Sequence, residues 1–322
     1  MLFSKGKDTT TASWQRWLRR FVVAILILIA AAYITDIMAD RWHDLSVSAF
    51  SLGALHWITL CAGITGTLTL SALYHVLLLR GIEAHDVPAT RIARAYALGQ
   101  IVRYIPGKVA GVAFQVGLLG GSVRAGSILL ALLVQAIHDY AWAFAFCGVL
   151  AWILLTDSAL PLLTFAPLIL LLHTLHYHRM IERIIAGLPF LHTHIPPLPT
   201  LEPKHASTAT ATLFLTWVPM LAVMPFAFSP VLDKHDALLA GLLYLIAAVV
   251  SLAIIVVPSG LVVREAIFVW LGGHAGMPAD TLFFIALATR ISMTIAEVIT
   301  VLMIVLLEAG QRAHDRMQQH DA

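Results

Sequence analysis

Residues 103–121, RYIPGKVAGVAFQVGLLGG, decide the fold, because they place a tyrosine, a Pro-Gly pair and two basic residues amid long apolar runs. Pro106 lacks an amide hydrogen and fixes its own φ, while Gly107 permits positive φ, so a helix arriving from Ile92 should end here and another begin at Lys108. Irregular backbone is tolerated at membrane depth only where protein or a water-filled cavity satisfies its polar groups. We therefore predict a broken helix, or a re-entrant loop, packed inside a bundle beside a cavity.

The composition is that of an integral membrane protein. Of 322 residues, 60% are hydrophobic and 12% charged, against roughly 45–50% and about 25% in soluble domains. Crossing the hydrocarbon core takes about 20 apolar residues, and the clearest apolar runs are Phe21–Tyr33, Ala54–Leu79, Ile128–Leu155, Ala237–Val257 and Thr281–Leu307. We predict an all-α polytopic bundle of about seven to eight spans with two Pro/Gly-broken re-entrant segments.

The distribution of charge predicts the topology. Five basic residues precede the first span, whereas Asp36, Asp40 and Asp44 follow it, so the positive-inside rule places the N-terminus in the cytoplasm. A cleaved signal peptide is the competing interpretation, but no clear small-x-small site follows the apolar run. We expect a multi-pass protein of the bacterial inner membrane.

One membrane domain, 21–308, is expected between a basic cytoplasmic N-terminus, 1–20, and a polar tail, 309–322. Its halves, 21–176 and 206–308, are joined by a Pro- and His-rich loop, 177–205. One conflict remains: seven full spans place the C-terminus outside, whereas Arg312 and Arg316 favour the inside.

A second break echoes the first. Residues 257–262, VPSGLV, parallel residues 105–110, IPGKVA, and each ends an apolar helix with Pro and Gly before another helix starts. Pro258 and Gly260 take the places of Pro106 and Gly107. Paired interrupted segments are a pointer to the midplane site of a transporter, so we expect an internal repeat with substrate between the two breaks.

Five polar residues beside the breaks are candidates for binding substrate. Arg103, Tyr104 and Lys108 either mark the cytoplasmic membrane edge or bind an anionic head group, aided by the helix N-terminus at Lys108. Arg264 and Glu265 follow the second break inside an apolar helix; they are either an interfacial pair or a site, since charge inside a membrane is costly.

Other buried polar residues extend this set. Arg290 and Glu297 lie seven residues apart, hence on one helix face, and are expected to line the same cavity. His138 and Asp139 are either a protonatable pair or partners for Gln135 and neighbouring helices. We therefore consider His138, Asp139 and Glu297 as proton-coupling candidates.

Several function classes have no support in the sequence. Cys61 and Cys147 fall in apolar runs and are expected to be small buried hydrophobes. Six histidines around one loop match no zinc spacing, so no metal is expected, and no cofactor motif is present. Hydrolase and ATPase motifs are absent. The basic residues follow membrane topology, which argues against nucleic acid.

The motifs YIPGK at 104–108 and PSGLVVREA at 258–266 resemble those of the lysylphosphatidylglycerol synthetase transmembrane-region family, also called the flippase-like domain family. The similarity covers about residues 20–308. In fused members a soluble aminoacyl-transfer domain follows the membrane part, and here only a short tail follows Leu307. The resemblance therefore implies the transport-like part without synthase activity.

Carried over residue by residue, the family's motifs fall on Tyr104, Pro106, Gly107 and Lys108, and on Pro258, Gly260, Arg264 and Glu265. The family commonly has a second glycine where this chain has Val262, so the second break is expected to be stiffer. Stand-alone members resemble translocators of lipids or lipid-linked sugars.

We expect a translocator of an anionic lipid or lipid-linked sugar, with Arg103, Lys108, Arg264 and Arg290 holding phosphate. Two alternatives stay open. One is a membrane-embedded transferase acting on polyprenyl phosphate, with His138, Asp139 and Glu265 as acid or base. The other is a non-catalytic partner of a glycosyltransferase.

Overall fold

The computed structural model describes residues 52–84, 86–102, 110–156, 203–253 and 263–320. Within these ranges the chain forms nine helices and no strand. The helices are α2 (Ala54–Ile82), α3 (Ala89–Val102), α4 (Ala110–Leu119), α5 (Ala125–Thr156), α9 (Pro203–Leu215), α10 (Val218–Ala227), α11 (Lys234–Ala253), α12 (Val263–His274) and α13 (Ala279–His320). The first predicted span, the loop 177–205 up to residue 202, and both breaks lie outside the described residues.

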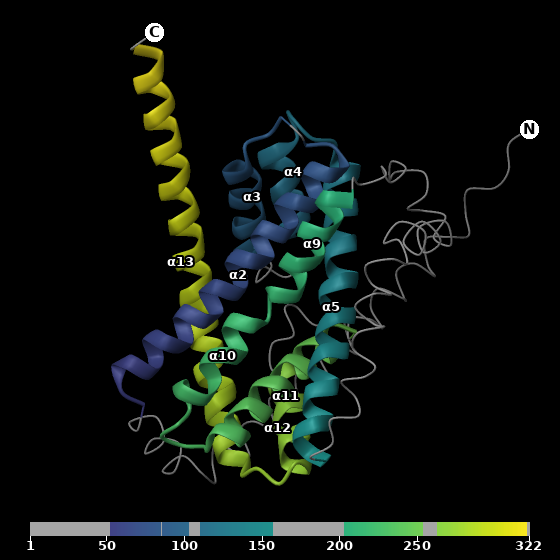
Figure 1. Ribbon diagram of the computed structural model, residues 1–322, viewed down its shortest axis with the longest axis vertical. Coiled ribbons are helices and arrows are strands. Elements are labelled where there is room, and N and C mark those ends of the chain that lie inside the picture. Colours follow the sequence, from purple (N-terminus) through teal and green to yellow (C-terminus); the bar gives the residue numbers. More distant parts are fainter. Residues whose placement is uncertain (1–51, 85, 103–109, 157–202, 254–262, 321–322) are drawn as a thin grey trace, which may run out of the picture.

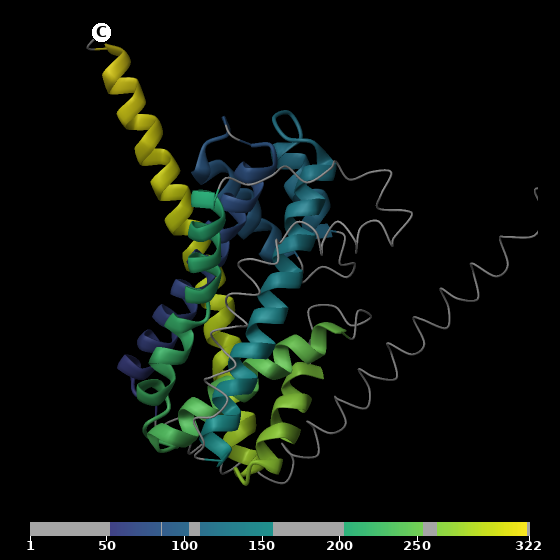
Figure 2. The same cartoon turned by 45° about the vertical axis from the view of Figure 1, so that its right-hand side comes forward.

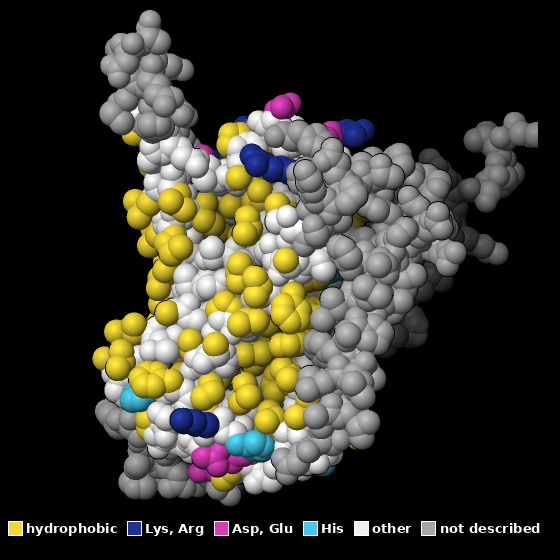
Figure 3. Space-filling view, in the orientation of Figure 1, with side chains coloured by type: hydrophobic (Ala, Val, Ile, Leu, Met, Phe, Trp, Pro, Cys, Tyr) yellow, Lys and Arg dark blue, Asp and Glu magenta, His cyan; other side chains and the backbone are white. Residues whose placement is uncertain are grey.

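Four helices are long and apolar enough to cross a membrane: Ala54–Ile82, Thr208–Ala227, Lys234–Ser251 and Ala279–Gln311. This confirms the expected all-helical, multi-pass class for the part of the chain described. Figure 3 shows hydrophobic side chains over the middle of one face and charged side chains at its upper and lower ends. Such a band between two polar rims suits a bilayer about 30 Å thick.

The long helices run in two opposite directions. α2 rises from the lower to the upper end of the bundle, α5 descends, α9 and α10 descend, and α13 rises again to the C-terminus (Figure 1). α9 and α10 are separated at Thr216 and Trp217, because Pro219, in the first turn of α10, has no N–H to bond the carbonyl of Leu215 and its ring crowds that carbonyl. The predicted polar tail continues α13 as helix through His320.

α3 and α4 form an antiparallel hairpin at the upper end (Figure 1). Near its open end, Arg91 on α3 donates from Nη2 to the carbonyl of Leu118 on α4, at 3.2 Å. Deeper in, the helices approach so closely that a Cβ on Gly111 would lie 2.7 Å from the carbonyl oxygen of Gly99. Glycine at both positions therefore permits the crossing.

The chain enters and leaves this hairpin at the same place. Glu83, after α2, accepts hydrogen bonds from Arg124 Nε at 2.7 Å and from the Ser127 hydroxyl, before and within the first turn of α5. Burial alone would raise the pKa of the Glu83 carboxyl, but these hydrogen bonds and the guanidinium charge hold its pKa below the usual range.

α11 and α12 form a second hairpin, which lies at the lower end. The α10–α11 connection and the α12–α13 turn both lie at the lower edge of the bundle (Figure 2). The rings of Tyr244 on α11 and Phe268 on α12 pack edge to face, with centroids 5.4 Å apart. Each hairpin belongs to its own cluster of buried apolar side chains, and the partly buried Phe146 and Trp217 pack against both clusters.

Candidate functional site

A cavity of about 290 Å³ lies where the two hairpins and the long helices meet. α3 contributes Tyr96 and Gln100, and α12 contributes Arg264. α2, α5, α10, α11 and α13 supply the rest of the wall that the structure describes. Ligand cavities commonly lie between helices of bundles and measure about 300 Å³ or more, so this one suits a small polar group.

Arg264, Glu265 and Arg290 form a cluster at this cavity. Arg264 donates to Glu265 Oε1 from Nη2 at 2.9 Å and from Nε at 3.3 Å. Arg290 Nη1, from α13, lies 4.0 Å from the same oxygen. Both arginines line the cavity, whereas Glu265 lies behind them. One carboxylate therefore holds two guanidinium groups at the wall.

The surroundings fix the orientation of Arg264, which is only 6% exposed. Its Cζ lies over the ring of Tyr244, 4.7 Å from the centroid, an arrangement in which the negative face of the ring attracts the cation. Its Nη1 lies 3.7 Å from the sulfur of Met293, a weak acceptor. The guanidinium is thus held by an aromatic ring, a carboxylate and a thioether.

A hydrogen-bond network centred on Gln135 forms another part of the wall. Its amide nitrogen donates to the Tyr96 hydroxyl at 3.0 Å and to the carbonyl and hydroxyl oxygens of Ser71. Its Oε1 lies 2.9 Å from His75 Nδ1, and since an amide oxygen only accepts, Nδ1 carries the proton. The His75 ring also stacks on Tyr96, with centroids 4.6 Å apart.

Three side chains that line the cavity have a buried oxygen without a hydrogen bond: Thr67 Oγ1, Asp139 Oδ1 and Thr289 Oγ1. They come from α2, α5 and α13. Buried polar atoms without partners are uncommon in folded proteins and call for water, an ion or a ligand. The cavity therefore combines guanidinium donors with acceptors that remain to be satisfied.

The proton-coupling candidates fall in different places. Asp139 lines the cavity, but His138 does not; its Nδ1 lies 3.1 Å from the Tyr74 hydroxyl. Glu297 is buried on α13 and does not line this cavity, although Arg290 does. The other predicted residues, Arg103, Tyr104, Pro106, Gly107, Lys108, Pro258 and Gly260, lie outside the described residues.

The structure adds residues that sequence reasoning did not single out, namely Ser71, His75, Tyr96 and Tyr244. Ser71 and His75 lie four residues apart within the apolar helix α2, so they share one face. A polar pair at that spacing in a membrane span is the signal that points to them. Tyr96 and Tyr244 carry no such signal, because tyrosine is also common at membrane interfaces.

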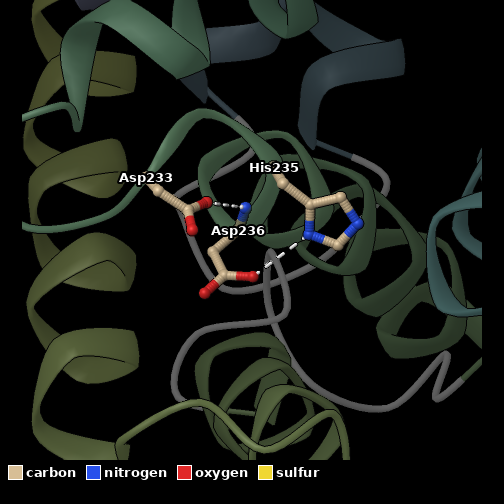
Figure 4. A group of neighbouring side chains, drawn as sticks. All are labelled: Asp233, His235 and Asp236. Atoms are coloured by element: carbon tan, nitrogen blue, oxygen red, sulfur yellow. Dashed lines mark hydrogen bonds and ion pairs between the residues drawn. The ribbon is translucent and has the colours of Figure 1, made fainter.

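A second polar group, Asp233, His235 and Asp236, lies at the start of α11 (Figure 4). Asp233 Oδ1 accepts the backbone N–H of Asp236 at 2.8 Å, as in an N-terminal helix cap. His235 Nδ1 lies 3.2 Å from Asp236 Oδ1, and Nε2 donates to the Leu154 carbonyl at 3.0 Å. Helix capping and docking onto α5 account for these three side chains.

No family model matches the chain, and no curated protein or solved structure was found to be similar to it. The chemistry of the site therefore has to be inferred from its own geometry. No histidine or cysteine is among the described residues that line the cavity. This wall can bind an anion and exchange a proton at Asp139, but it offers no activated Ser or Cys nucleophile.

Proposed function

We propose that the chain is a translocator that carries the anionic head group of a lipid across the bacterial inner membrane, in the manner expected of the flippase-like domain family. The observation that carries the proposal is the cavity between the two hairpins, lined by Arg264 and Arg290. Guanidinium groups bind phosphate through paired N–H donors. Charged groups inside a membrane bundle commonly mark a substrate pathway.

The hairpins support this function if they are re-entrant. The described parts of α3 and α4 pack against each other as an antiparallel pair at the upper end of the bundle, as the two arms of a re-entrant hairpin would. Glu83 and Arg124 show that the chain enters and leaves at one end.

The same interpretation resolves the conflict over the C-terminus. On this proposal α11, which rises from the lower end, and α12, which returns to it, form a re-entrant pair (Figure 2), and Lys234–Ser251 is not counted as a crossing although it is long and apolar enough to be one. The sequence also predicts spans at about 21–38 and 160–175, which lie outside the described residues. Together with α2, α5, α9 with α10, and α13, they make six crossings. Both termini would then share one side.

The distribution of arginines supports a cytoplasmic side for both termini. Arg80, Arg91, Arg94 and Arg124 lie at the end where the first hairpin opens, and the opposite end carries Asp233, Asp236 and Asp280. By the positive-inside rule the upper end of Figure 1 faces the cytoplasm. Thr90 of α3 donates to Gln311 of α13 at 2.9 Å, so the end of α13 lies there too.

Lipid transport by the purified full-length protein in proteoliposomes tests the proposal. Phosphatidylglycerol, phosphatidic acid and polyprenyl phosphate with labelled head groups would be compared. We expect at least one to cross, and Arg264→Ala and Arg290→Ala to slow it at least tenfold, with Arg264→Lys intermediate because lysine lacks the fork.

Arg124→Ala is the matched control, because Arg124 is 70% exposed at the rim and does not line the cavity. It should leave the rate unchanged. If no tested lipid crosses, or if the cavity and rim variants slow transport equally, the proposal is wrong.

A further inference from the structure

The two described halves of the chain repeat the same helix order in opposite directions. The first half runs α2, α3, α4, α5; the second runs α9 with α10, then α11, α12, α13. α2 rises where α9 and α10 descend, and α5 descends where α13 rises (Figure 1). The hairpin of each half packs against the last helix of the other half, α3 against α13 and α11 against α5.

The last helices also agree residue by residue. Adding 154 to a residue number of α5 gives the equivalent position, here called its partner, in α13. Ile128 is thus equivalent to Leu282 and Ala131 to Ile285, and all four side chains are fully buried. The turn before each helix agrees too. The Ile128 amide bonds the Arg124 carbonyl, and the Leu282 amide bonds the carbonyl of Pro278, the partner of Arg124.

The same register describes the cavity wall. Gln135, Ala136 and Asp139 of α5 line the cavity, and so do Thr289, Arg290 and Met293, their partners on α13. The cavity therefore lies on the approximate two-fold axis that relates the halves. The side chains themselves are not symmetric, since α13 contributes Arg290 and α5 contributes the carboxylate of Asp139.

Two contacts between the halves occupy equivalent places at opposite ends. The upper latch joins α3 to α13 through Arg94 Nη1 and Glu308 Oε2, at 2.7 Å, and through Thr90 and Gln311. The lower latch joins α11 to α5 through His235 Nε2 and the Leu154 carbonyl. Thr90 and His235 are each the second residue of their helix, and Leu154 is the partner of Glu308 in the register.

We propose that the chain is an inverted-topology repeat that works by alternating access, with the two latches opening in turn. The proposal rests on the proposed function and adds its mechanism. Because each latch joins one half to the other, a rocking of the halves about the axis through the cavity parts one latch and keeps the other. Both latches are made in the structure.

The energetics suit a device that opens repeatedly. The upper latch is a hydrogen bond and a partly exposed ion pair, and the lower latch is a hydrogen bond at an exposed histidine. Such contacts are weak, because water and lipid head groups compete for the same atoms. Ligand binding can therefore shift the balance between the open states.

Reversible cross-linking tests the mechanism in the full-length protein. In a Cys61→Ala, Cys147→Ala background, one variant carries Thr90→Cys with Gln311→Cys and a second carries His235→Cys with Leu154→Cys. Each also carries Thr67→Cys as a reporter on the cavity wall. A short reducible thiol cross-linker first joins the two latch cysteines. A membrane-impermeant maleimide is then added to one face of oriented vesicles, and labelling of the reporter cysteine is measured.

We expect the reporter in the protein without latch cysteines to react from both faces. Closing the upper latch should suppress labelling from the upper face at least fivefold and leave the lower face reactive, and closing the lower latch should do the reverse. Reduction should restore both, so each variant serves as its own folding control. Equal labelling from both faces with either latch closed would overturn the proposal.

The lipid assay separates this inference from the proposed function. If labelling alternates as expected but no lipid is transported, the alternating-access mechanism is supported and the proposed lipid substrate is wrong. If lipid moves equally well with either latch closed, alternating access is wrong and the cavity keeps its role in binding.

Discussion

The two hairpins have the same topology but different interiors. α3 and α4 meet backbone to backbone at Gly99 and Gly111, whereas α11 and α12 meet through Tyr244, Phe268 and the side chain of Arg264. In the first hairpin the two helices approach closely because glycine has no side chain, and in the second hairpin large side chains fill the space between the helices. The comparison suggests that the first hairpin is built for close packing and the second for holding a cation at the cavity.

The largest expected effect is on the second hairpin, from Glu265→Gln. The change keeps the shape of the side chain but leaves Arg264 and Arg290 without their carboxylate. Removing one partner of a buried ion pair costs about 3–5 kcal/mol. The midpoint of thermal unfolding in detergent measures it.

A double-mutant cycle sharpens this prediction. Arg264→Met combined with Glu265→Gln should cost less than the sum of the single changes, because both members of the closer ion pair, at 2.9 Å, are removed together and only Arg290 loses its carboxylate. Additive costs would mean that the two residues do not act as a pair.

The next effect breaks the first hairpin. Gly111→Ala places a Cβ 2.7 Å from the Gly99 carbonyl oxygen, so the helices must separate. Overpacking of this kind costs about 1–3 kcal/mol. Gly117→Ala, one and a half turns along α4, is the matched control, because a Cβ there meets nothing within 4 Å.

Gly117→Ala should be neutral or stabilising by up to about 1 kcal/mol, from the higher helix propensity of alanine. Both variants are compared by their unfolding midpoints. Equal shifts would show that the close approach of the two helices contributes nothing.

A smaller effect tests the ring beneath Arg264. Tyr244→Leu removes the aromatic face, and Tyr244→Phe keeps it. A cation over a desolvated ring is worth about 0.5–2 kcal/mol, so the leucine variant should be less stable than the phenylalanine variant by about that amount. The difference should shrink in an Arg264→Met background, and a constant difference would assign it to packing alone.

The smallest effect concerns the entrance to the first hairpin, at Glu83. Because the pKa of Glu83 is lowered in the folded protein, its ion pair stabilises the fold above the ordinary carboxyl value and is lost as the pH falls through the folded value. Arg124 is largely exposed, so the loss in Glu83→Gln should stay below about 1 kcal/mol.

The measurement is the unfolding midpoint of the wild type and of Glu83→Gln as a function of pH. The gap between them should be full at neutral pH and close as the pH falls below 4.5, the ordinary value. A gap that widens on acidification would contradict the assignment.

Apolar length and charge predicted most of the fold. Helices are present on both sides of each break, α3 and α11 before it and α4 and α12 after it, whereas the breaks themselves lie outside the described residues. Apolar length could not distinguish a full crossing from a helix that turns back. Helix α11 is long and apolar enough to cross a membrane, so its re-entrant course together with α12 stays a prediction.

The candidate site was predicted in part. Arg264, Glu265 and Arg290 lie together, and charged residues within apolar sequence are conspicuous. His138 and Asp139 are adjacent in a helix, about 100° apart around its axis, so they face different neighbours. Arg290 and Glu297 share a face but lie about 10 Å apart along the axis, which is too far for one small cavity.

The length of α13 has a consequence for observing the protein at work. Its 42 residues form one continuous rod, which places Arg290 at the ligand cavity and His320 about 45 Å further along the same axis. A tilt of about 5° at Arg290 would displace the distal end by about 4 Å, given the rise of a straight helix. A spin label or fluorophore at this end would therefore detect, from the aqueous phase, small tilts of α13 that accompany ligand binding at the cavity.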